Sequence, residues 1–149
     1  MVGSEFEDRI RYYALVWWPA RSIVENSIKN RFQVDQSGSI IFIDGFAPWK
    51  SHLFDLEKEM NLTNNEIKYI IYKDGTNGTW RIQCVPICEN SFTNRLSLPA
   101  EWCGLRDDEL SKKAEIDNCI FVHSNGFIGG NKTYEGALLM LQKSLRVSK

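Results

Sequence analysis

The chain has 149 residues, a formal net charge of −1, and 43% hydrophobic and 12% aromatic residues. A chain of this length is expected to form one domain that buries roughly 68–70% of its unfolded surface. No run approaches the ~20 apolar residues of a membrane helix, so we expect a soluble protein with no membrane partner. The near-neutral charge excludes strong overall basicity, so any contact with nucleic acid must be local.

The four cysteines form no paired CxxC framework, and no histidine accompanies them. We therefore expect reduced thiols, a reducing intracellular compartment and no metal site in this chain. The first six residues contain Gly-Ser-Glu-Phe, which is typical of a cloning junction. We interpret residues 1–6 as a cloning remnant and residues 7–149 as a single domain.

The first half of the chain predicts three helices and a strand. Apolar residues recur at helical spacing over 7–18, and Pro19 suits the first turn of a second helix. The residues expected to line one side of that helix are Ile23, Val24, Ile28 and Phe32. The β-branched run 40–43 predicts a strand buried on both faces. Pro48 opens a third helix, in which we expect His52 at the surface.

Residues 67–73 and 79–87 predict two strands joined in a hairpin by a five-residue loop that is rich in turn signals. The second strand has an alternating pattern. Trp80, Ile82 and Cys84 alternate with Arg81 and Gln83, so one face is apolar and the other presents hydrogen-bonding groups. The polar face is either exposed to solvent or turned towards a ligand.

The second half continues with an ordered loop over 89–106, which we expect to be anchored by Phe92, Leu96, Leu98 and Trp102. A short helix is predicted over 107–114, a core strand over 119–122, a glycine-bearing loop over 123–132 and an amphipathic helix over 133–146. The fold class is therefore α/β, or more closely mixed α+β. A mixed, largely antiparallel sheet of four to five strands is expected, flanked by helices.

The glycine-bearing loop is the candidate site that the local pattern favours. A strand, glycines and a helix start in this order offer backbone amides, hydroxyls and a lysine to an anion such as phosphate. The alternative is a purely structural turn, since the loop lacks a Walker A ending and a convincing dinucleotide fingerprint. The candidate substrate-binding residues here are His123, Ser124, Asn125, Gly126, Gly129, Gly130, Asn131, Lys132 and Thr133.

Other polar residues are open to two interpretations. His123 follows a strand, where it either holds a substrate oxygen or caps the loop by hydrogen bonding. Arg21 lies in the first turn of a predicted helix, where a cation opposes the helix dipole, so it either serves a ligand or is an ordinary exposed arginine. The same alternatives apply to Arg81, Gln83, Arg95 and Arg106.

Six blocks in order resemble the melanocyte proliferating gene (MYG) family. They are WPARSIVE (18–25), RFQVDQSG (31–38), PWKSHL (48–53), WRIQCVP (80–86), GLRD (104–107) and CIFVHSNGFIGG (119–130). The resemblance covers nearly everything after residue 7. It implies a DHH-type phosphoesterase that acts as a metal-dependent 3′-to-5′ RNA exonuclease in the nucleus and mitochondrion. The resemblance also implies that the divalent metal, manganese or magnesium, is held in an N-terminal domain; this chain contains no Asp-His-His cluster.

The resemblance leads to the hypothesis that the chain is the C-terminal substrate-binding domain of a larger hydrolase. It would have no catalytic residues of its own, and the implied partners are RNA or a nucleotide phosphate and the protein's own N-terminal catalytic domain. Whether the protein forms a homo-oligomer is left open. Lys132 and the loop amides would hold the phosphate, with Arg21, Arg81 and His123 as further candidates. In DHH enzymes a glycine-histidine loop closes over the substrate; here Asn131 stands in place of that histidine.

A second hypothesis is a non-catalytic single-stranded RNA or protein-interaction module, motivated by the missing metal ligands and by five tryptophans. A third is an autonomous hydrolase that uses a cysteine or serine.

Overall fold

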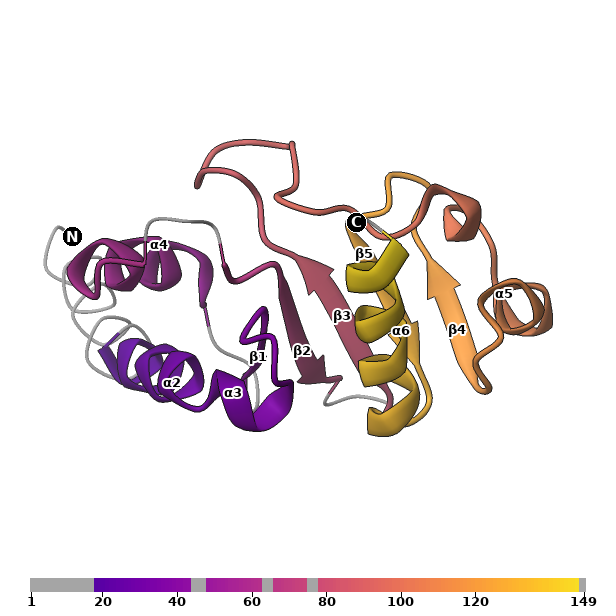
Figure 1. The fold of residues 1–149 in the computed structure, drawn as a ribbon, viewed down its shortest axis with the longest axis horizontal. Helices are drawn as coiled ribbons and strands as arrows, with labels where there is room; N and C mark the ends of the chain where they lie inside the picture. The colour runs from indigo at the N-terminus through magenta and orange to yellow at the C-terminus, as the bar shows by residue number, and fades with distance from the viewer. Residues whose placement is uncertain (1–17, 44–47, 63–65, 75–77, 148–149) are drawn as a thin grey trace, which may run out of the picture.

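A computed structural model describes residues 18–43, 48–62, 66–74 and 78–147 of the chain (Figure 1). The predicted helix over 7–18 lies outside these residues except for Trp18. The elements, in chain order, are α2 (Trp18–Lys29), α3 (Arg31–Val34), β1 (Ile40–Ile43), α4 (Lys50–Glu59), β2 (Tyr69–Lys73), β3 (Trp80–Cys84), a 3-10 turn η2 (Ala100–Trp102), α5 (Asp107–Ala114), β4 (Cys119–Val122), β5 (Ile128–Asn131) and α6 (Tyr134–Val147).

The strands form one mixed sheet in the order β1-β2-β3-β5-β4. β1 and β2 are parallel, whereas the pairs β2–β3, β3–β5 and β4–β5 are antiparallel. The predicted mixed, largely antiparallel sheet is therefore confirmed. The hairpin predicted for 67–87 is present as the antiparallel pair β2 and β3; part of its loop lies outside the described residues.

The glycine-bearing loop is shorter than predicted, because residues 128–131 form strand β5. β5 lies between β3 and β4, so both of its edges are paired. Glycine disfavours strands locally, which hides this one from pattern reasoning. The tertiary structure uses the missing side chain: a Cβ at Gly130 would lie 2.6 Å from Nη1 of Arg81 and 3.1 Å from the ring of Phe121.

Two hydrophobic cores lie on opposite faces of the sheet. One core joins the sheet to α5 and α6 and includes Ile82, Leu110 and Met140. The other joins α2 and α4 to β1 and β2 and includes Ile41 and Ile70. In Figure 1, α2 and α4 lie at the opposite end of the molecule from β4. As a result, no helix among the described residues covers the second face of β3, β5 and β4.

Three predictions about individual side chains are wrong. Phe32 is 57% exposed, because α2 ends at Lys29 and the break before α3 rotates the helical face. His52 is buried, because it lies one turn from Leu56 on the side of α4 that packs into the second core. Phe92 is fully exposed, so it does not anchor the loop before α5, whereas Leu98 and Trp102 do.

Arg95 joins the loop between β3 and α5 to the rest of the molecule. Its Nη1 and Nη2 donate to the two carboxylate oxygens of Glu57 at 2.8 and 2.7 Å, and Nη1 also donates to the carbonyl of Ile67 at 2.9 Å. The side chains of Arg95 and Glu57 are only 3% and 6% exposed. Arg95 therefore has a structural role that joins the loop to α4 and to the segment before β2.

Asp35 links the turn before β1 to α6. Its carboxylate accepts hydrogen bonds from the amide and hydroxyl of Ser37 and, at 2.9 Å, from the amide of Gln142. Burial alone would raise the pKa of Asp35, but the hydrogen bonds from Ser37 and Gln142 outweigh it and lower that pKa.

A carboxyl group whose pKa is lower in the folded state stabilises the fold above its unfolded pKa of ~3.9 and loses this contribution as the pH falls through the folded value. We therefore expect Asp35→Asn to lower the free energy of unfolding by about 1 kcal/mol at pH 7. The difference from the unchanged chain should shrink below about pH 4. Urea unfolding at pH 7 and at pH 3 measures the difference in the free energy of unfolding between the two proteins. A difference that is the same at both pH values would contradict the role of the charge.

The described cysteines are all free thiols. Burial raises the pKa of Cys84 to about 12 and also raises the pKa of Cys119, whereas Cys88 is exposed. Because the thiolate is the reactive form, we expect Cys88 to react first with Ellman's reagent at pH 8, and Cys84 and Cys119 only after unfolding. A fast phase attributable to Cys88 should disappear in Cys88→Ser; its full persistence would contradict the assignment.

Candidate functional site: the open face of the sheet

The turn between β4 and β5 holds the first group of candidate residues. The amide of His123 donates to the carbonyl of Ile128 at 2.9 Å, and Gly126 closes the turn with a positive φ of 68°. Nδ1 of His123 accepts the amide of Asn125 at 3.1 Å, and its ring lies 4.9 Å from that of Phe127. His123 therefore does cap the loop by hydrogen bonding. It is exposed, as are Ser124 and Asn125.

The second group of candidates lies at the other end of β5, where α6 begins. Asn131 is fully buried; its Oδ1 accepts the amide of Thr133 at 2.9 Å and its Nδ2 donates to the carbonyl of Asp117 at 3.0 Å. Oγ1 of Thr133 accepts the amide of Gly136 at 3.0 Å. Side chains of the chain itself thus cap this helix start, and Lys132 is exposed beside it.

The candidate residues of the glycine-bearing segment therefore do not form one binding site. A strand of four residues spans roughly 13 Å at ~3.3 Å per residue, and β5 separates His123, Ser124 and Asn125 from Lys132 and Thr133. The amides of Gly129 and Gly130 belong to a strand paired on both sides. Arg21 lies apart from both groups, on α2, where it pairs with Asp55 at 2.5 Å and with Glu59.

Three of the candidates do share one surface, the uncovered face of β3, β5 and β4. Arg81 is paired with Gly130, Gly130 with Phe121, and Phe121 with Arg106, so these four residues form a row across neighbouring strands. Paired residues project to the same face. The guanidinium of Arg81 lies 5.2 Å from the ring centroid of Phe121, directly over Gly130.

A second row runs beside the first. Gln83 is paired with Ile128, whose carbonyl accepts the amide of His123. Gln83 and Ile128 lie two positions from Arg81 and Gly130 in β3 and β5, so they project to the same face. His123 directly follows β4, two positions after Phe121. We call the surface formed by both rows the open face. It consists of Arg81, Gln83, Arg106, Phe121, His123, Ile128 and Gly130.

The candidate substrate-binding residues do not include four members of the open face: Gln83, Arg106, Phe121 and Ile128. Phe121 belongs to the strand predicted to lie in the core, yet it is only partly buried and lies between the two arginines. Arg106 is exposed and lies two residues after Gly104, which has a positive φ. The alternation of Phe121 and His123 around buried Val122 is the signal in the sequence that points to this face.

The chemistry of the open face suits an extended anionic ligand that carries aromatic groups. Two guanidinium groups bring positive charge to this face, and Phe121 offers a ring for stacking. Arg81 is held in place by Asp74 at 3.2 Å and by the hydroxyl of Thr79 at 3.1 Å. Gly130 is buried beneath them, and its missing side chain lets the arginine and the ring of Phe121 lie against the strand.

Comparison with known proteins gives the family. The model of the MYG1 exonuclease family, described as an uncharacterised protein family (UPF0160), matches residues 1–145. The chain belongs to this family. It is 47% identical over 146 residues to the MYG1 exonuclease of Homo sapiens, 49% over 150 residues to the MYG1 protein C27H6.8 of Caenorhabditis elegans and 52% over 148 residues to the MYG1 protein of Dictyostelium discoideum.

These matches cover 97–99% of this chain but only 38–44% of the relatives' lengths, and the chain corresponds to their C-terminal part. The resemblance to the MYG family is thus confirmed. No solved structure shows significant similarity to this MYG1 family chain. All residues of the open face lie within the part that the family model matches.

Metal-binding and membrane-spanning features are both missing from the described part of this MYG1 family chain. No three His, Cys, Asp or Glu side chains there come together in a group able to hold a metal ion. No helix within the same residues has the length and apolar character needed to cross a membrane.

Proposed function

We propose that this chain is the C-terminal substrate-binding part of a MYG1-family exonuclease and that its open face holds the phosphate backbone of RNA. The observation that carries the proposal is the row formed by Arg106, Phe121, Gly130 and Arg81 on a sheet face that no described helix covers. The names of the mammalian relatives, which contain the word exonuclease, support the general activity.

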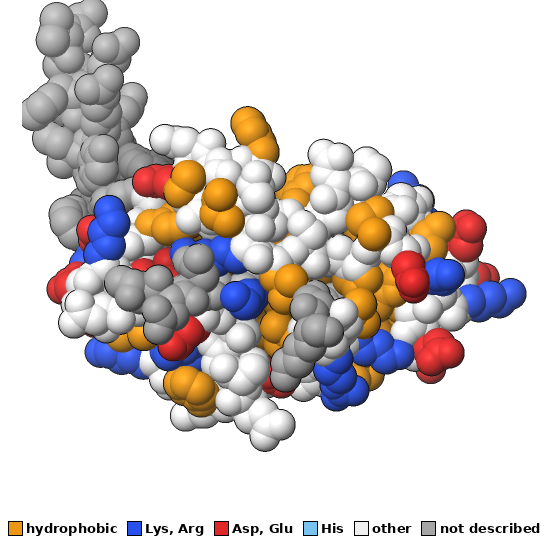
Figure 2. All heavy atoms as spheres, turned by 45° about the horizontal axis from the view of Figure 1, so that its top comes forward, with side chains coloured by type: hydrophobic (Ala, Val, Ile, Leu, Met, Phe, Trp, Pro, Cys, Tyr) orange, Lys and Arg blue, Asp and Glu red, His pale blue; other side chains and the backbone are white. Residues whose placement is uncertain are grey.

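The charge of the molecule requires such a local site. The net charge is −1, and in the view of Figure 2 the Lys and Arg side chains are interspersed with Asp and Glu. Without a broad basic surface, attraction to RNA must come from a few well-placed cations. Arg81 is one such cation. Asp74 holds its partly exposed guanidinium in a fixed orientation. Phosphate contacts of this kind position a substrate without reading its sequence.

The catalytic chemistry belongs, in this proposal, to the part of the protein that precedes this chain. We propose that this part resembles DHH-type phosphoesterases, holds manganese or magnesium and closes on the open face with the RNA between them. The described residues of the chain do not fit a metal ion, so we derive no catalytic step from them. By the same resemblance we propose that the protein acts in the nucleus or mitochondrion.

The test uses a protein that joins this chain to the preceding part of its family. Arg81→Gln with Arg106→Gln should raise the KM for labelled single-stranded RNA at least tenfold, because each charge-assisted hydrogen bond contributes about 1.5–3 kcal/mol. The slope of log Kd against log salt should fall by about 0.7 for each phosphate that the variant no longer binds. Exonuclease assays in the presence of manganese and binding titrations measure both.

Lys113→Gln provides the matched control, because Lys113 is exposed on α5, which packs on the other side of the sheet. This control should leave both KM and the salt slope near those of the unchanged protein. The proposal fails if the double arginine variant keeps its KM and salt slope while its thermal unfolding shows an intact fold.

A further inference from the structure

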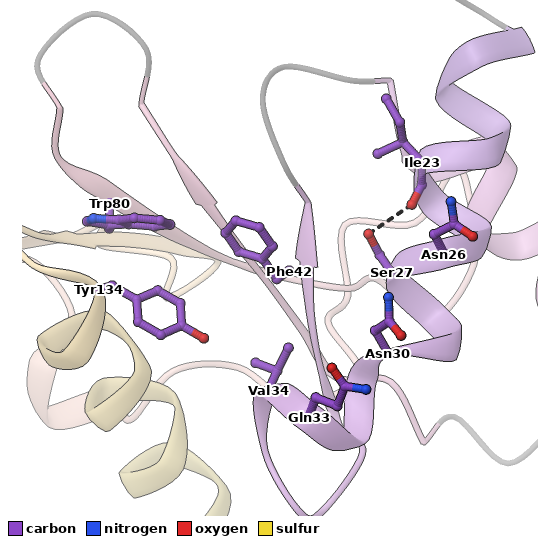
Figure 3. Close-up of a pocket in the computed structure, with 9 residues that line it drawn as sticks. All are labelled: Ile23, Asn26, Ser27, Asn30, Gln33, Val34, Phe42, Trp80 and Tyr134. Atoms are coloured by element: carbon purple, nitrogen blue, oxygen red, sulfur yellow. Dashed lines mark hydrogen bonds between the residues drawn. The ribbon is translucent and has the colours of Figure 1, made fainter.

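A cavity of about 520 Å³ lies on the side of the sheet opposite the open face. It is bounded by α2 and α3 on one side and by the start of α6 on the other, with β1 and β3 between them (Figure 3). Its size falls within the range of small-molecule sites. Trp80 lines the cavity and Arg81 belongs to the open face, because consecutive side chains of β3 project to opposite sides of the sheet.

One wall of the cavity is aromatic. The ring centroids of Trp80 and Tyr134 are 5.0 Å apart at 67°, and those of Phe42 and Trp80 are 5.9 Å apart at 38°. All three rings are half-buried and therefore keep surface that faces the cavity. Burial raises the pKa of Tyr134, so its hydroxyl remains protonated at neutral pH and available as a donor.

The facing wall carries side-chain amides. Asn26 and Asn30 from α2 and the segment after it, and Gln33 from α3, line the cavity on the helix side (Figure 3). All three residues are exposed, and their side-chain amides make no hydrogen bond to another residue within the described part of the chain. Each amide offers both donors and an acceptor.

The lining of the cavity contains no charged residue among those that the structure describes. A phosphate or a charged side chain would therefore find no counter-ion there. A neutral, planar ring with donors and acceptors on its edge fits better, because its faces stack on aromatic side chains and its edge pairs with Asn and Gln amides. Nucleobases have this combination of properties.

We propose that this cavity binds a nucleobase, which stacks against Trp80 and is held at its edge by Asn26 and Gln33. The proposal rests on the proposed function, since single-stranded RNA is the source of the base. It adds a site for the base on the side of the sheet away from the arginines that would hold the backbone.

The test uses adenosine and uridine, which carry no phosphate and so do not depend on the arginines of the open face. Nuclear magnetic resonance titration of the chain should shift the indole N–H signal of Trp80. Asn26→Ala combined with Gln33→Ala should weaken nucleoside binding about tenfold, and Trp80→Leu should do so as well. Asn90→Ala, which removes an exposed amide elsewhere, is the matched control and should bind like the unchanged chain.

The outcomes separate this site from the proposed function. Binding that is weakened by Asn26→Ala with Gln33→Ala, but unchanged by Arg81→Gln with Arg106→Gln, supports the nucleobase site. Ribose binding as tightly as adenosine would overturn it. So would the absence of any shift with millimolar nucleosides; the proposed function would still stand if the arginine variants raised the KM for RNA.

Discussion

Replacing Arg95 with methionine is expected to lower the free energy of unfolding by about 3–5 kcal/mol. The guanidinium donates to both carboxylate oxygens of Glu57, and the two side chains are 3% and 6% exposed. Methionine would leave the carboxylate of Glu57 buried without a counter-ion, and it would also leave the carbonyl of Ile67 without that donor. The loop between β3 and α5 should loosen, because Arg95 joins it to α4.

Urea unfolding followed by circular dichroism measures this loss. Arg21→Met is the matched control, since Arg21 also pairs with two carboxylates, but those of Asp55 and Glu59 are 65% and 63% exposed. Exposed ion pairs contribute little, so this control should lose less than about 1 kcal/mol. The double variant Arg95→Met with Glu57→Met should recover much of the stability. A loss below about 1 kcal/mol for Arg95→Met alone would show that Glu57 is not a buried, charged partner.

Gly136→Ala is expected to destabilise the fold by about 2 kcal/mol, although alanine is the better helix former. A Cβ at residue 136 would overlap the side-chain amide of Asn131, which is fully buried and caps the start of α6. If Asn131 moved, α6 would lose its cap. Buried polar groups would also be left without hydrogen bonds, which costs about 1–3 kcal/mol. This outweighs the ~1 kcal/mol gain in helix propensity.

The two positions should therefore be strongly coupled. In an Asn131→Ala background the overlap disappears, so Gly136→Ala should become neutral or stabilise the fold by up to about 1 kcal/mol. A cycle of the two single variants and the double variant measures the coupling by urea unfolding. Simple additivity of the two changes would contradict the assignment of Asn131 as a buried cap.

The sequence was sufficient where a residue's local neighbours decide its structure. Pro19 in the first turn of α2, the β-branched run of β1, and the alternation in β3 each reflect a short-range preference, and each element forms as expected. It was insufficient for β5, because Gly129 and Gly130 have no intrinsic strand preference. Their conformation follows from pairing with β3 and β4, which come from distant parts of the chain.

The candidate site divides in the same way. The sequence points to Arg81, Gly130 and His123; Arg81 and Gly130 lie side by side in paired strands, whereas His123 lies in the turn after β4. The surroundings of Asn131 and His52 depend on which element packs above them, so their burial was not predictable from spacing alone. Phe121 and Arg106 join the open face only because β4 lies beside β5.

The sequence by itself determined the family and the class of fold. The six ordered blocks and the alternating patterns carry that information, because they depend on residue type and spacing along the chain. Only the tertiary structure decided that residues 128–131 form a strand inside the sheet and that Asn131 caps a helix. It also decided that aromatic and amide side chains line a cavity on the side of the sheet opposite the arginines. Strand pairing and the packing of helices against one half of a sheet act between distant segments, and no local pattern records them.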